Sequence, residues 1–384
     1  MNTTAAPPTA PHSKHRDVDF DLHGLAAVRL VGASSSDVAA VGRQLGPLQP
    51  TLDREPEIVV RFVDRLATSS RIRFLGLGEV GFTDDAFIVL RSKHKAPARV
   101  TIDFSQIGER VEIVCERGLP AVPLLVPILN LTVLARGVVP LHASAFVHNG
   151  TGVVATGWSK GGKTEALLAF AARGARYVGD EWVYVSGGGE RVYGIPEPIR
   201  LWEWHLSQLP RYEALIGRSN RARLRGTRLL LSSERAMRRF GSARLTILRD
   251  LSRLAPILKR QLFVDVDPEV LFGRLETQSA PFDRLFLLMS HEAPDITVEP
   301  VDPVEVGERM VFSLQHERLD FLAAYLKFRF AFPKAANSFI EQAEELQRSA
   351  LRRAFVRKPC FAVRHPYPFS LDALFEAMSP YCKS

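Results

Sequence analysis

Short runs of apolar residues separated by polar turns fill the first third of the chain. Four of these runs have the length and the β-branched content of strands, namely Ala26–Val31, Glu57–Val63, Ala86–Leu90 and Val111–Val114. Between the first two, Ser35–Leu45 has the apolar spacing of a helix, with Ser35 or Ser36 as its N-cap. The pattern predicts a small α+β domain over residues 18–118, in which we find no catalytic motif.

The pattern changes after residue 118. The apolar stretch Leu119–Leu134 is interrupted by prolines, which predicts a buried helix and a helical connector over residues 119–140. Short apolar runs then alternate with a helical segment, so we predict an α/β domain over residues 141–302. Residues 303–384 have mainly helical spacing and are predicted to pack on that domain.

The composition narrows the class of protein. A chain of 384 residues is long enough for two domains, and its net charge of +8 favours an acidic partner. The three cysteines, Cys115, Cys360 and Cys382, lack metal-ligand spacing, which argues against a zinc site or a disulfide framework and for a cytoplasmic protein. Cys382, near the chain end, is expected to be an exposed thiol. We expect a disordered tail over residues 1–17 and no membrane span.

One motif carries chemistry. Residues 157–164 read Gly-Trp-Ser-Lys-Gly-Gly-Lys-Thr and match the phosphate-binding pattern G-x-x-x-x-G-K-[ST]. Such a loop surrounds phosphate with backbone N–H groups, its lysine reaches the β- and γ-phosphates, and its hydroxyl holds Mg²⁺. The alternative is a chance match. The context favours the motif, because an apolar strand-like run, Gly152–Thr156, precedes it and a helix-forming segment, Lys163–Arg173, follows.

An acidic pair after this motif and a histidine before it are further candidates. Asp180 and Glu181 form an acidic pair 16 residues after Thr164, where a carboxylate can meet Mg²⁺ or an attacking hydroxyl; the alternative is a solvated acidic turn. His142 precedes the strand that leads into the loop. It is either a donor or proton relay beside the γ-phosphate, or a structural histidine.

These residues at these intervals resemble the catalytic core of the HPr kinase/phosphorylase family and its relatives, the HPr-kinase-like serine kinases. The similarity covers residues 141–185, through His142, the phosphate loop followed by Glu165, the pair Arg173-Gly174 and the acidic pair. It implies a phosphoenolpyruvate-carboxykinase-like P-loop nucleotide-binding domain, preceded here by the smaller α+β domain. It also implies an ATP- or GTP-dependent kinase that requires Mg²⁺ and phosphorylates a seryl hydroxyl.

The resemblance assigns roles by position. It implies that Asp180 is the base, that Thr164 and Glu181 bind the metal ion, and that Lys163 and His142 act on the transferring phosphoryl group. The residues that it implies for nucleotide binding form one run: Gly157, Ser159, Lys160, Gly161, Gly162, Lys163, Thr164 and Glu165.

The chain also departs from the family pattern. Glu181 stands where the family usually has aspartate, and residues 196–204 lack the Glu-x-x-Gly-x-Gly-type signature of the bifunctional enzymes. The resemblance therefore implies neither a phosphorylase activity nor HPr as the acceptor. Arg200 in this region is a candidate phosphate or substrate contact. The relatives include kinases of natural-product precursor peptides and of free serine, so the acceptor is a Ser-containing or acidic peptide, a small protein or a small molecule.

A basic segment follows. Arginines are frequent between Arg218 and Arg239, which indicates either a landing surface for an acidic substrate or a solvated helix. Because no aromatic residues lie among those arginines, nucleic-acid binding is not favoured. The leading hypothesis is the kinase, which is compatible with a homo-oligomer. The alternatives are a nucleotide-binding regulator or scaffold with weak or no transfer, and a plain nucleotide hydrolase.

Overall fold

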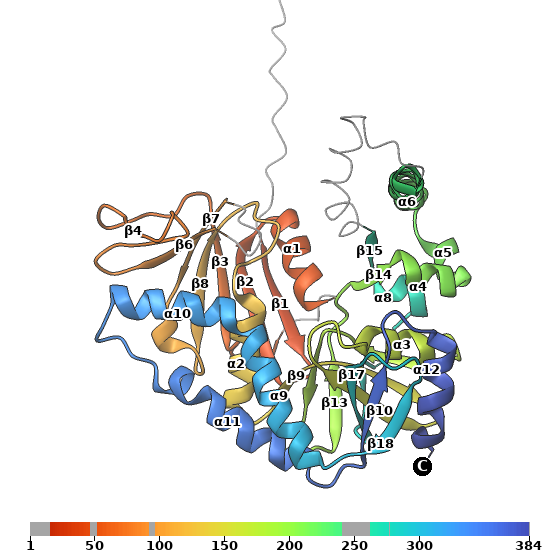
Figure 1. Ribbon diagram of the computed structural model, residues 1–384. Coiled ribbons are helices and arrows are strands. Elements are labelled where there is room, and N and C mark those ends of the chain that lie inside the picture. The colour runs from red at the N-terminus through yellow and green to blue at the C-terminus, as the bar shows by residue number, and fades with distance from the viewer. Residues whose placement is uncertain (1–15, 47–51, 92–96, 240–261, 276, 384) are drawn as a thin grey trace, which may run out of the picture. The chain divides into compact units, whose positions relative to one another are not determined.

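The computed structural model describes residues 16–46, 52–91, 97–239, 262–275 and 277–383, except for the side chains of residues 233–239 (Figure 1). The fold contains both helices and strands, and its two large sheets each combine parallel and antiparallel strands. This agrees with the predicted α/β class. The chain divides into two compact units. Unit 1 contains residues 1–137 and 317–346, and unit 2 contains residues 138–316 and 347–384.

Unit 1 is built on an eight-stranded sheet with the order β1-β2-β3-β8-β7-β6-β5-β4. The pairs β2–β3 and β3–β8 are parallel and the other neighbours are antiparallel. Four of these strands correspond to the four predicted apolar runs. The strand bounds are β1 Arg16–Leu22, β2 Ala26–Ala33, β3 Ile58–Val63, β4 Arg73–Leu75, β5 Val80–Phe82, β6 Phe87–Arg91, β7 Pro97–Ile102 and β8 Val111–Glu116.

The helices of unit 1 pack by their apolar faces. They are α1 Ser35–Leu45, α2 Leu125–Ala135, α10 Leu319–Ala331 and the first half of α11 Ser338–Phe355. Helix α1 has the predicted bounds, but its N-cap is Ser34, which forms a capping box with Asp37. The aromatic face of α10 belongs to this unit's core, because Phe328 lies 5.8 Å from Phe87 and 5.3 Å from Phe104, ring centre to ring centre.

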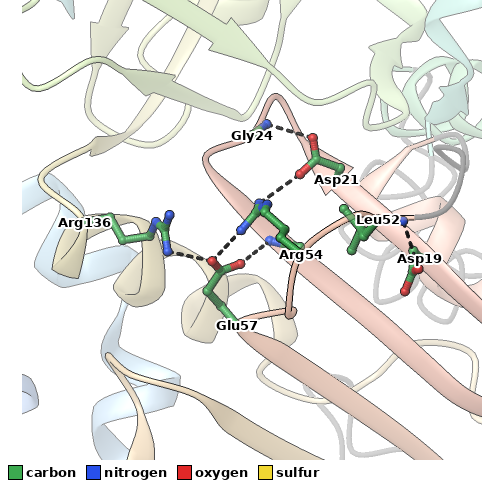
Figure 2. A network of polar contacts seen from close by, with 8 residues as sticks. Asp19, Asp21, Gly24, Leu52, Arg54, Glu57 and Arg136 are labelled. Carbon is green, nitrogen blue, oxygen red and sulfur yellow. Dashed lines mark hydrogen bonds and ion pairs between the residues drawn. The ribbon is translucent and has the colours of Figure 1, made fainter.

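A polar network joins the first strands of unit 1 to α2 (Figure 2). Arg54 donates to Asp21 of β1 over 2.9 Å and to Glu57, which directly precedes β3, over 2.5 Å. Glu57 also accepts from Arg136, at the end of α2, over 2.6 Å, and from the backbone N–H of Ala27. Glu57 is largely buried, so these bonds compensate for the desolvation of its charge.

Unit 2 is built on a nine-stranded mixed sheet. Its path is β16-β13-β12-β9-β10-β17-β19-β18, and β11 pairs with β9 beside β12. The central strands β10, β17 and β19 are parallel, whereas β9 runs antiparallel to β10. The strand bounds are β9 Val139–His148, β10 Thr151–Gly157, β11 Arg176–Gly179, β12 Trp182–Val185, β13 Arg191–Gly194, β16 Ser279–Pro281, β17 Arg284–Ser290, β18 Thr297–Pro300 and β19 Cys360–His365.

Helices cover this sheet, and a small second sheet joins β14 Ile199–Trp202 to β15 Phe263–Val266. Helix α3 Lys163–Ala171 is almost entirely buried and packs beside α12 Leu371–Met378 (Figure 1). The remaining described helices are α4 Glu203–Gln208, α5 Pro210–Leu215, α6 Arg218–Arg239, α8 Pro268–Phe272 and α9 Pro303–Glu317, with the last residues of α11. One apolar core joins α3, α4, α5 and α12 to β10 and β17.

The division into units differs from the division predicted from the sequence. The prediction began the second domain at residue 141 and expected residues 303–384 to pack on it as a mainly helical part, whereas residues 317–346 belong to unit 1. The physical reason is that α10 buries aromatic side chains among those of β6 and the Phe104 turn. Within the predicted tail, residues 1–15 lie outside the described residues, whereas Arg16 and Asp17 begin β1.

One smaller expectation was wrong. Cys382 is not an exposed thiol: it is buried in the unit 2 core, and burial raises its pKa to about 12. Arg364 and His365 end β19, which lies between β17 and β18 inside the sheet.

Candidate nucleotide site

The predicted phosphate loop connects β10 to α3, so the strand–loop–helix context that the motif needs is present. Three of its residues have left-handed backbone conformations: Gly157 with φ 153°, Lys160 with φ 62° and Gly162 with φ 102°. Because L-residues with a Cβ disfavour this region, the two glycines allow the chain to turn back into the helix. The loop is closed by the N–H of Gly161, which donates to the carbonyl of Trp158.

Close packing also requires glycine at these positions. A Cβ on Gly157 would lie 2.4 Å from the carbonyl oxygen of Leu288 in β17, and a Cβ on Gly162 would lie 2.7 Å from Nε2 of His365. Both approaches are shorter than carbon allows, so the loop backbone is fitted against β17 and β19. The spacing of the motif predicted these glycines, but their neighbours come from strands more than 120 residues away.

Buried hydroxyl groups anchor both ends of the loop. Ser144 of β9 donates to the carbonyl of Lys163, the first residue of α3, over 2.7 Å. Ser313 of α9 donates to the carbonyl of Gly157 over 3.2 Å. The exposed ring of Trp158 stacks on His316 of α9 with a centroid distance of 4.9 Å. The loop is therefore fixed by strand β9 on one side and by helix α9 on the other.

Lys163 and Thr164 begin α3. The Lys163 side chain is largely buried, and its Nζ donates to the carbonyl of Trp158 over 2.9 Å, so the ammonium lies within the curve of the loop. Thr164 donates to Oδ2 of Asp180 over 3.0 Å. Of the remaining predicted loop residues, Ser159 is half-buried and Lys160 is exposed.

Asp180 follows β11 and is fully buried. Burial and the neighbouring Glu181 charge raise its pKa to about 7, although the Thr164 hydrogen bond and Lys163 act in the opposite direction. Its second oxygen, Oδ1, is buried and has no hydrogen-bond partner among the described residues. A buried carboxyl with one oxygen unsatisfied is the kind of group that binds a ligand, a metal ion or a proton of a substrate.

Glu181, the residue after Asp180, is paired with His142. His142 of β9 lies opposite Trp182 in the β9–β12 pairing, and its Nε2 is 3.0 Å from Oε2 of Glu181. Glu181 has φ 64°, a left-handed conformation that costs a non-glycine residue on the order of 1 kcal/mol. The structure thus brings His142 to Glu181, and it brings Asp180, the residue before Glu181, to Thr164 at the start of α3.

Glu165 and Arg200 lie in other surroundings. Glu165 is buried, and its Oε1 accepts from Nε2 of His205 over 3.1 Å. The backbone N–H of Trp202 donates to Nδ1 of the same ring, so the proton of neutral His205 is on Nε2. Arg200 makes two hydrogen bonds to Asp265, at 2.8 and 3.2 Å, and stacks over Phe263, so these side chains hold the arginine in the small β14–β15 sheet.

The sequence did not predict the residues that support the loop from afar. His365 is fully buried, and its Nε2 lies 2.9 Å from the carbonyl oxygen of Gly161. Ser313 and His316 contact the loop from α9. No motif signals any of these residues, because they are brought to the loop only by the order of the strands and by the return of the chain through α9.

The side chains of Thr164, Asp180 and Glu181 offer oxygen atoms of the kind that bind magnesium. Thr164 Oγ1, Asp180 Oδ1 and the Glu181 carboxylate are hard ligands, and Mg²⁺ typically takes only one or two carboxylates and completes its shell with phosphate oxygens and water. In the described part of the chain there is no group of three or more His, Cys, Asp or Glu residues arranged to hold a metal ion on their own.

A cavity of about 430 Å³ lies among the described residues of unit 1. Acidic and aromatic residues line it, but its carboxylates have partners: Asp84 pairs with Arg73, Glu112 with Arg61, and Asp103 with Ser105. It contains none of the predicted site residues. Across the described ranges, no helix combines the length and the apolar character needed to cross a bilayer.

Comparison of the chain with protein-family models and with curated protein sequences found no match.

Proposed function

We propose that the protein is a nucleotide-dependent, Mg²⁺-requiring serine kinase of the HPr-kinase-like type, with a phosphoenolpyruvate-carboxykinase-like P-loop domain in unit 2. The single observation that carries the proposal is the contact between the Thr164 hydroxyl and the buried Asp180 carboxyl, directly beside the phosphate loop. A structural aspartate gains nothing from burial with one free oxygen, whereas a kinase needs a carboxylate at this point.

In the proposed reaction the loop backbone and Lys163 hold the β- and γ-phosphates of ATP or GTP. Thr164 and Glu181 would hold Mg²⁺, which would supply neutralisation of charge on the phosphates. Asp180 takes the proton of the seryl hydroxyl while that oxygen forms a bond to the γ-phosphorus, and the bond from the γ-phosphorus to the β–γ bridging oxygen breaks to release the nucleoside diphosphate. A pKa of about 7 suits a general base at neutral pH.

His142 completes the proposed site through Glu181. Its Nε2 lies 3.0 Å from the Glu181 carboxylate, and its ring lies against Trp182 with a centroid distance of 5.6 Å. We assign it the role of orienting Glu181, with a direct contribution to the γ-phosphate charge when it is protonated. The strained backbone of Glu181 is consistent with a residue that is held in place for a function.

A transfer screen tests this proposal. The full chain is incubated with γ-labelled ATP or GTP and Mg²⁺, together with free serine, Ser-containing peptides and small acidic proteins, beside Lys163→Ala. We expect label on a seryl oxygen with the wild type and little transfer with the variant, since positioning and charge neutralisation supply most of the rate. Nucleotide binding without transfer to any acceptor would favour a regulator, and acceptor-independent release of phosphate would favour a hydrolase.

A further inference from the structure

The order of strands in unit 2 separates two different environments around the phosphate loop. The loop follows β10. On one side of β10 lie β9, which carries His142, and β11 and β12, with Asp180 and Glu181 between them. On the other side lie β17 and then β19, which ends at His365. The pair Asp180–Glu181 is therefore on one side of β10, and a different set of side chains lies on the other.

That other set is an aromatic cluster that begins at the loop itself. The buried ring of His365 contacts the carbonyl of Gly161 and lies 4.3 Å from the ring of Phe369. Phe369 lies 6.0 Å from Trp204 of α4 and 6.3 Å from Tyr367, and these two rings lie 5.7 Å apart. The rings of His365, Phe369, Trp204 and Tyr367 thus form a continuous path from the phosphate loop outward.

The path ends in an exposed ring. His365 and Phe369 are buried and Trp204 is half-buried, whereas 51% of Tyr367 is exposed. Neighbouring aromatic rings hold Tyr367 in place, while about half of its surface is open to solvent. The Tyr367 and Trp204 rings are nearly perpendicular, at 83°, so a flat molecule stacked on Tyr367 would lie at about a right angle to the Trp204 ring.

Glu165 fixes where this ring lies relative to the helix that follows the loop. Glu165 is the residue directly after Thr164, and His205, the neighbour of Trp204, holds its carboxylate. The Trp204 ring lies 4.2 Å from the His205 ring and 5.7 Å from the Tyr367 ring, centre to centre. Tyr367 is therefore linked to the first turn of α3 through Trp204, His205 and Glu165.

A bound nucleoside triphosphate has a direction. For transfer, its terminal phosphoryl group must lie on the Asp180 side of the loop, so the nucleoside end extends toward the opposite side, where β19 ends. We propose that Tyr367 and Trp204 form the nucleobase subsite, with the base stacked on the Tyr367 ring. This inference rests on the proposed function. Stacking of this kind is tolerant of base identity and contributes about 1–3 kcal/mol per base.

Calorimetric binding to the full chain tests this subsite with two probes, Mg·ATP and Mg·tripolyphosphate, which share the phosphate chain but not the base. The wild type should bind ATP more tightly than tripolyphosphate. Tyr367→Ala should weaken ATP binding by roughly 5- to 150-fold, the factor that corresponds to loss of one stacking contact. Its affinity for tripolyphosphate should change less than twofold. Tyr367→Phe should bind ATP like the wild type, because the ring is retained.

The controls separate this inference from the proposed function. Phe312→Ala removes another exposed aromatic ring of unit 2 and should leave both affinities unchanged. Unchanged ATP affinity in Tyr367→Ala, or equal affinity of the wild type for both probes, would overturn the subsite while leaving the phosphate loop as a binding site. Binding of neither probe by the wild type would overturn the proposed nucleotide site and the subsite with it. Melting temperatures of all variants check that each is folded.

Discussion

At the scale of single residues, burial of Asp180, the candidate base, makes the stability of the folded protein depend on pH. Its pKa is raised from 3.8 to about 7, chiefly by burial. The folded state therefore keeps a proton that the unfolded chain releases as the pH rises above about 4. The stability that comes with this proton is fully present below that pH and is lost progressively up to about pH 7.

We therefore predict that Asp180→Asn stabilises the protein above pH 7. Because asparagine carries no charge to desolvate, the variant should gain on the order of 1–4 kcal/mol of unfolding free energy at pH 8 relative to the wild type, and much less at pH 4. Denaturant unfolding at the two pH values measures this difference. Asp372→Asn, at an exposed carboxylate, is the control and should differ from the wild type by less than about 0.5 kcal/mol at both. Equal effects of Asp180→Asn at pH 4 and pH 8 would contradict the account.

A second residue-scale prediction concerns the loop backbone. Gly162→Ala places a Cβ at φ 102° and 2.7 Å from His365, so the loop must shift. We expect Mg·ATP affinity to fall at least tenfold, together with a loss of about 1–3 kcal/mol of stability. Gly226→Ala in α6, where no atom lies within 4 Å of the new Cβ, should keep the affinity and slightly stabilise its helix. Calorimetry and thermal unfolding measure the two effects; normal affinity in Gly162→Ala would show that the loop conformation is not needed.

At the scale of elements, the pair Glu165–His205 joins α3 to α4. Both side chains are buried, so removal of one leaves the other unsatisfied. We predict that His205→Ala costs about 2–4 kcal/mol, through cavity formation and the unpaired Glu165. A double-mutant cycle with Glu165→Gln should give a coupling energy of about 0.5–3 kcal/mol. Additive effects of the two substitutions would show that the hydrogen bond does not connect these helices energetically.

Local sequence predicted the strand, loop and helix of the candidate site, but not the distant residues that contact the loop. The strand before the loop, the helix after it and the glycines between them are encoded within about 20 residues, so periodicity and motif spacing were sufficient. The same holds for Asp180, which directly follows the next strand. His365 and Ser313 meet the loop only because β19 lies beside β17 and because α9 packs against the end of β10. Such contacts depend on topology, which apolar patterns do not specify.

At the scale of the whole molecule, the chain returns to unit 1 after building most of unit 2. The segment 317–346 buries Phe321, Tyr325 and Phe328 in the core around Phe104. A sequence-based division could not detect this return, because the apolar spacing of α10 predicts a helix but not the sheet that the helix covers.

This connectivity predicts how fragments behave. Residues 138–384 expressed alone would expose the aromatic face of α10, and residues 1–137 alone would expose the sheet that α10 covers. We expect both fragments to aggregate or to bind a hydrophobic dye strongly, and co-expression to restore a soluble pair that comigrates on size exclusion. A fragment 138–384 that is monomeric, binds no dye and melts cooperatively would contradict this assignment of residues 317–346.

The central claim is that Asp180 acts as the base in phosphoryl transfer from a nucleotide held by the phosphate loop. The most direct test compares the pH dependence of transfer in the wild type and in Asp180→Asn, with Mg·ATP and the best acceptor from the screen. We predict a wild-type rate that rises with pH as the Asp180 carboxyl ionises, since the base must be unprotonated. The variant should still bind Mg·ATP but transfer at least about 100-fold more slowly, without that pH dependence. A variant that transfers phosphate at the wild-type rate would contradict the claim.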